Sequence, residues 1–118
     1  MKHLMIAGAF VLAFAQGASA QLDVPVELQQ TYAENTGMAL AAAQACPKYE
    51  LDGLEMETVG TILVVPGEAL VSVYRSFLKK GFVSFTTSFE DHGLEAACGA
   101  AWNALGDDGL GFLKTTET

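Results

Sequence analysis

The chain is poor in the residues that most catalytic and metal sites require. Beyond the first 20 residues it has a single histidine, His92, and two cysteines, Cys46 and Cys98. A C-x-x-C pair of the thioredoxin type is missing, and one histidine with two distant cysteines is too few for a zinc or haem site. A G-x-S-x-G nucleophile motif is missing as well. The sequence therefore predicts a protein that is not an enzyme and uses no metal or other cofactor.

Basic residues are also scarce. The chain has six Lys and Arg against 14 Asp and Glu, which gives a formal net charge of −8. Nucleic acids and anionic lipid surfaces bind proteins through basic patches. We therefore expect neither nucleic acid nor a membrane surface among the partners, and we interpret the acidic side chains as a solvated surface.

Long hydrophobic runs are confined to the N-terminus. Lys2 and His3 precede an apolar run from Leu4 to Ala15, and the small-residue pattern A-x-A follows at 18–20. These are the three parts of a secretory signal peptide. The run is shorter than the roughly 20 residues that span a bilayer. We expect residues 1–20 to be a cleaved signal peptide, and the mature chain to be periplasmic or secreted without membrane insertion.

The two cysteines lie in similar surroundings, "AAAQAC" for Cys46 and "EAACGAA" for Cys98. Small side chains allow two backbones to reach the Cα separation below about 7 Å that a disulfide requires. An even count in a chain expected to enter an oxidising compartment favours a bond over free thiols. The pattern predicts a Cys46–Cys98 disulfide that joins two helices, with Trp102 covering it one turn after Cys98.

Helix signals dominate the rest of the chain. The composition and apolar spacing predict helices over 24–45, from Asp52 to about 65, over 66–80 with Gly81 as the C-cap, and from about 88 to 105. The last of these rests on the capping-box spacing of Thr87 and Glu90. Residues 54–65 also allow a strand, because several of them are β-branched.

These helices predict an all-α fold in one domain. We expect a small bundle of four to five helices over residues 21–106, cross-linked by one disulfide. The segment 107–118 is rich in glycine and polar residues, so we expect a flexible C-terminal tail.

Aromatic residues are concentrated in one short stretch. It contains Tyr74, Phe77, Phe82, Phe85 and Phe89. The simplest role for them is to fill the core, because the alanine-rich first helix provides little bulk. They are also suited to a partly exposed apolar surface that binds a protein partner or a small apolar ligand.

The layout of a signal peptide, a short helical domain and one long-range disulfide is similar to that of the small acid-stress chaperones of the bacterial periplasm. No motif of that family is matched residue by residue, so the resemblance concerns layout alone. We expect a small exported, non-enzymatic protein of the cell envelope with an interaction, accessory or chaperone-like role. The alternative is a carrier of a small hydrophobic ligand, with a pocket lined by the five aromatic residues.

Overall fold

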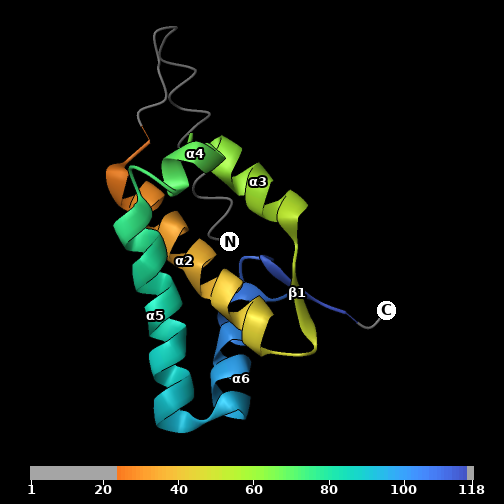
Figure 1. The fold of residues 1–118 in the computed structure, drawn as a ribbon. Coiled ribbons are helices and arrows are strands. Elements are labelled where there is room, and N and C mark those ends of the chain that lie inside the picture. Colours follow the sequence, from red (N-terminus) through yellow and green to blue (C-terminus); the bar gives the residue numbers. More distant parts are fainter. Residues whose placement is uncertain (1–23, 117–118) are drawn as a thin grey trace, which may run out of the picture.

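The computed structural model describes residues 24–116, which form an all-α fold (Figure 1). This part of the chain contains five helices: α2 (Val26–Ala45), α3 (Gly53–Ile62), α4 (Gly67–Leu70), α5 (Arg75–His92) and α6 (Leu94–Leu105). Two short strands, β1 (Tyr49–Leu51) and β2 (Leu113–Thr115), form the single sheet of the described region. The predicted fold class is confirmed, whereas the expected signal peptide, residues 1–20, lies outside the described residues.

Helices α2 and α5 run in the same direction (Figure 1), and two glycines, Gly37 and Gly81, lie where they cross. A Cβ atom added to Gly37 would overlap the carbonyl oxygen of Leu78, and one added to Gly81 would overlap the carbonyl oxygen of Glu34. Only glycine allows the two backbones to approach this closely. The prediction that Gly81 ends a helix is therefore wrong, because α5 continues through it to His92.

Helix α6 is tied to the end of α2 by the Cys46–Cys98 disulfide, whose Cα atoms are 5.9 Å apart. This bond confirms the prediction from the cysteine surroundings. The rings of Tyr49 and Trp102 stack with their centroids 4.9 Å apart. Tyr49 follows Cys46 by three residues and Trp102 follows Cys98 by four, so the stacked pair lies beside the disulfide.

The break between α5 and α6 occurs at Gly93, not near Ser88 as predicted. Gly93 has a φ of 93°, in the left-handed region that favours glycine. Residues 87–90 continue α5, so the capping-box spacing there caps no helix. The predicted helix over 66–80 is also divided, because α4 ends at Leu70 and α5 begins only at Arg75. The intervening turn contains the β-branched residues Val71 and Val73, which are weaker helix formers.

Helix α3 begins where the sequence predicts and ends in an unusual way. The Asp52 carboxylate accepts a hydrogen bond from the backbone N–H of Glu55 at 3.1 Å, which caps the first turn. At the other end, the N–H of Val65 donates to the Gly60 carbonyl oxygen at 2.8 Å, the pattern of a Schellman motif. Val64 occupies the position of this motif that is usually glycine, with a φ of 60°. Left-handed backbone is unfavourable by about 1–2 kcal/mol for residues other than glycine.

The C-terminal segment completes the core. Phe112 and Leu113 are 0% and 1% exposed, and Tyr32 packs edge-on against Phe112 with ring centroids 5.9 Å apart. Strand β2 pairs antiparallel with β1, so that Leu113 lies opposite Leu51. The expectation of a flexible tail is therefore wrong for residues 110–116, which supply Phe112, the largest fully buried side chain of the described region.

Candidate functional site

An apolar groove lies between the C-terminal halves of α2 and α5. Its volume is about 330 Å³, and it is lined by Ala41, Gln44 and Ala45 of α2 and by Phe82, Phe85, Thr86 and Phe89 of α5. We call it the phenylalanine groove. It lies beyond the glycine crossing, where the two helices diverge (Figure 1). The alanines of α2 leave this space open because their side chains are too short to fill it.

The three phenylalanines of the groove differ in burial. Phe85 is 4% exposed and belongs to the core, whereas Phe82 is 36% exposed and Phe89 is 40% exposed. The rings of Phe85 and Phe89 meet edge-on with their centroids 6.4 Å apart, which steadies the exposed ring against the buried one. Exposed large apolar side chains beside a hollow are typical of binding surfaces.

The other two aromatic residues singled out from the sequence lie elsewhere. The Tyr74 hydroxyl donates a hydrogen bond to Oε1 of Gln29 at 2.6 Å, near the N-terminal end of α2. Phe77 is half-buried and does not line the groove. The structure thus brings together three of the five aromatic residues. Only Phe85 of the five is buried, with 4% exposure, and the largest fully buried side chains are instead Phe112, Leu105 and Leu113.

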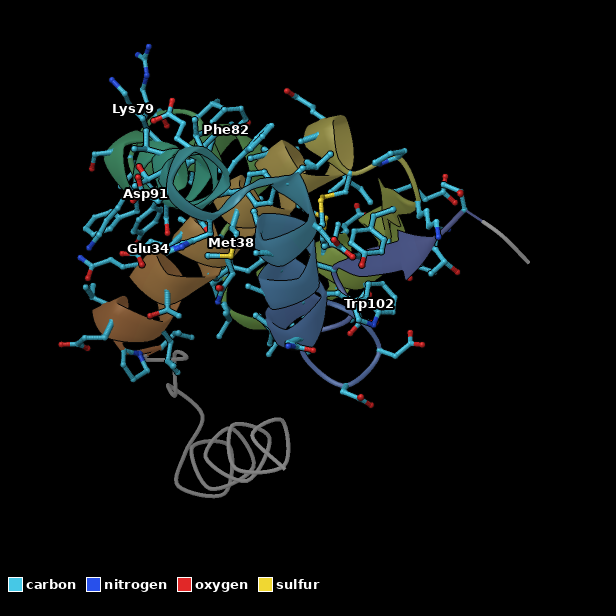
Figure 2. The ribbon with its side chains drawn as sticks, turned by 90° about the horizontal axis from the view of Figure 1, so that it is seen from below. Glu34, Met38, Lys79, Phe82, Asp91 and Trp102 are labelled. Carbon is cyan, nitrogen blue, oxygen red and sulfur yellow. A yellow bond between two sulfur atoms is a disulfide. The ribbon has the colours of Figure 1, made fainter. Side chains whose placement is uncertain are left out.

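Two basic side chains share the groove's face of α5. Arg75 and Lys79 precede Phe82 by seven and three residues, a spacing that places all three on one side of a helix. Lys79 and Phe82 extend from the same side of α5, away from Glu34 (Figure 2). Lys80 forms an ion pair with Glu34 at 3.4 Å, whereas Arg75 and Lys79 have no ion-pair partner among the described residues. Cations in the first turns of a helix oppose its dipole, so helix stability does not explain their position.

A second and larger cavity lies between α2, the end of α3 and the start of α4. We call it the Tyr32 pocket; its volume is about 600 Å³. It is lined by Tyr32, Glu57, Gly60, Thr61, Val64, Val65, Pro66, Gly67 and Leu70. Sequence reasoning missed this pocket, because its residues come from three elements and follow no common pattern. No sequence signal pointed to it, because the predicted helix from Asp52 to about 65 included Val64, whose left-handed backbone appears only in the structure.

One wall of the Tyr32 pocket is held by a chain of hydrogen bonds. The amide of Gln29 donates to the carbonyl oxygen of Leu63 at 2.9 Å, and Tyr74 in turn donates to Gln29. These bonds fix the turn that contains Val64. Tyr74 therefore stabilises this wall of the Tyr32 pocket and does not line the phenylalanine groove.

The single histidine beyond residue 20, His92, is exposed at the end of α5. No cluster of three or more His, Cys, Asp and Glu side chains in the described region forms a possible metal site. None of the helices between residues 24 and 116 combines the length and the apolar character needed to cross a membrane.

Protein-family models, curated proteins and solved structures offer no match to this chain. The case for a function therefore rests on the groove and the pocket themselves.

Proposed function

We propose that the protein is a small exported, non-enzymatic binding protein that takes up apolar side chains of a protein partner in the phenylalanine groove. The observation that carries this proposal is the exposure of Phe82 and Phe89 on either side of the buried Phe85. Aromatic side chains that a partner can cover contribute strongly to the affinity of protein interfaces. An interaction, accessory or chaperone-like role in the cell envelope is compatible with such a groove.

Two features support export. The first 20 residues have the parts of a signal peptide, as their sequence indicates. The Cys46–Cys98 disulfide is compatible with an oxidising compartment outside the cytoplasm.

Two basic side chains on the same side of α5 as Phe82 support one further feature of the partner. Arg75 and Lys79 lie on the face of α5 that carries Phe82, so a partner segment with carboxylates next to its apolar side chains is complementary to this face. The groove is open to solvent and small, whereas carriers enclose most of the surface of their ligands. These features favour a protein segment over the enclosed small ligand of the carrier alternative.

Two short synthetic peptides test this proposal. Both contain the same central Leu and Phe residues, which are flanked by Asp in one peptide and by Lys in the other. We expect the Asp-flanked peptide to bind the purified protein, and a Phe82→Ser variant to lose about three- to fivefold in affinity. Full burial of a phenylalanine is worth about 1.5–3 kcal/mol, and Phe82 is 36% exposed, so a partner can add roughly a third of that amount. Titration by isothermal calorimetry measures both affinities.

A neighbouring valine provides the matched control. Val83 is 48% exposed on α5 and does not line the groove, so Val83→Ser is expected to bind as the wild type does. The Lys79→Gln variant is expected to bind the Asp-flanked peptide about threefold more weakly, since an exposed ion pair contributes less than about 1 kcal/mol. Equal binding of both peptides, or unchanged binding by Phe82→Ser, contradicts the proposal.

A further inference from the structure

The polar side chains that line the Tyr32 pocket have no hydrogen left to donate. The Tyr32 hydroxyl donates to the Met56 carbonyl oxygen at 3.0 Å, and the Thr61 hydroxyl donates to the Glu57 carbonyl oxygen at 2.9 Å. Burial raises the pKa of the Tyr32 phenol, so the hydroxyl keeps its hydrogen at neutral pH. The ionised carboxylate of Glu57 only accepts hydrogen bonds. A ligand that satisfies these three groups must therefore bring the donors itself.

The side-chain charge of the lining is negative, and opposite it the N-terminus of the one-turn helix α4, at Pro66 and Gly67, adds a partial positive charge. Glu57 is the single charged side chain among the lining residues. Thr61, in the last turn of α3, also lines the pocket, and the C-terminal end of a helix carries partial negative charge. Both features favour a cation. The remaining side chains of the lining are mostly apolar, including Val64, Val65 and Leu70, so they favour a hydrocarbon body.

Val64 gives an independent indication that this pocket has a function. Its left-handed backbone is unfavourable for a β-branched residue, and glycine at this position would remove the strain. Glycine would also remove the side chain that lines the pocket. Strained residues held by surrounding hydrogen bonds, as Gln29 holds this turn, occur preferentially at binding sites.

From these features we propose that the Tyr32 pocket binds a small amphipathic amine, protonated on nitrogen, whose N–H groups reach Glu57, Thr61 and the Tyr32 oxygen while its hydrocarbon part packs on Val64 and Leu70. This site is distinct from the phenylalanine groove, because the two cavities share no lining residue.

Three eight-carbon probes separate the features of this ligand. They are octylammonium, octyltrimethylammonium and octanoate, each titrated into the mature protein by NMR. We expect octylammonium to bind and octanoate to bind at least about tenfold more weakly, since the carboxylate is repelled by Glu57 and provides no donor. The trimethylammonium compound keeps the charge without N–H donors, so we expect an affinity between the two.

Substitutions on α3 locate the site. Glu57→Gln is expected to weaken octylammonium binding by about fivefold, the effect of losing one partly exposed charge partner. Glu55→Gln removes the same charge from the same helix outside the pocket and is expected to bind octylammonium as the wild type does. Val64→Gly is expected to raise the melting temperature while it weakens binding, which distinguishes a binding role from a structural one.

The Phe82→Ser variant separates this inference from the proposed function, because it is expected to leave octylammonium binding unchanged. Octanoate binding as tightly as octylammonium overturns the inference. So does equal weakening by Glu57→Gln and Glu55→Gln, or the absence of octylammonium binding at millimolar concentration.

Discussion

Replacing Gly81 with alanine is expected to lower the free energy of unfolding by about 3 kcal/mol or more, enough to leave a domain of this size marginally folded. The added methyl group would overlap the Glu34 carbonyl oxygen. A backbone atom inside a helix cannot move aside as a flexible side chain can, so α2 and α5 would have to separate. Gly37→Ala is expected to act in the same way from the other helix, since its Cβ would overlap the Leu78 carbonyl oxygen.

Gly99 provides the control for this prediction. It lies in α6, and a Cβ atom there would have no neighbour within 4 Å. Gly99→Ala is expected to stabilise the protein by about 0.5–1 kcal/mol, because alanine is the better helix former. Urea unfolding followed by circular dichroism measures all three variants. A Gly81→Ala protein as stable as the wild type would show that the helices do not cross at this point.

Reduction of the Cys46–Cys98 disulfide is expected to have an effect of similar size. The two cysteines are 52 positions apart. The chain-entropy model gives about 4 kcal/mol for a loop of this length, which corresponds to a decrease of roughly 15–30 °C in the melting temperature of a small domain. Scanning calorimetry with and without a reductant measures the decrease. A Cys46→Ala/Cys98→Ala double variant should reproduce it.

Trp102 provides a local readout of the same bond. It is the single tryptophan of the chain, and its ring stacks on Tyr49 beside the disulfide. We expect its emission to change on reduction, since the end of α2 and the start of α6 are then no longer tied together. An unchanged melting temperature after complete reduction, or free thiols in the native protein, would contradict this role of the bond.

The sequence was sufficient for the features that depend on local chemistry. The helix expected over 24–45 is α2, Val26–Ala45, and the helix expected from Asp52 is α3, Gly53–Ile62, which Asp52 caps. The disulfide followed from an even cysteine count and the small residues around each sulfur. The helix signals act within one or two helical turns, and the disulfide, which joins residues 52 positions apart, was predictable because the chain beyond residue 20 has just two cysteines and is expected to enter an oxidising compartment.

The features that were missed depend on contacts between distant segments. Gly81 after two lysines has the pattern of a helix C-cap, but here the glycine accommodates a crossing helix. Phe112 follows a glycine-rich stretch and so resembled part of a loose tail, although it packs against Tyr32 in the core. Because Phe112 and Leu113 fill the centre, Phe82 and Phe89 are not needed there.

The exposed phenylalanines of the groove are expected to serve binding rather than folding, and Phe82 tests this most directly. The decisive experiment measures two quantities on one Phe82→Ser preparation, the free energy of unfolding and the affinity for the Asp-flanked peptide. The Phe85→Ala variant shows how much stability is lost when a phenylalanine of the core is removed. We expect Phe82→Ser to lose about 1–2 kcal/mol of stability, because most of its ring is already covered in the folded protein, and about three- to fivefold in affinity. Phe85→Ala is expected to lose about 3 kcal/mol of stability or more. If Phe82→Ser is destabilised as strongly as Phe85→Ala and still binds the peptide, the groove is part of the core and not a binding site.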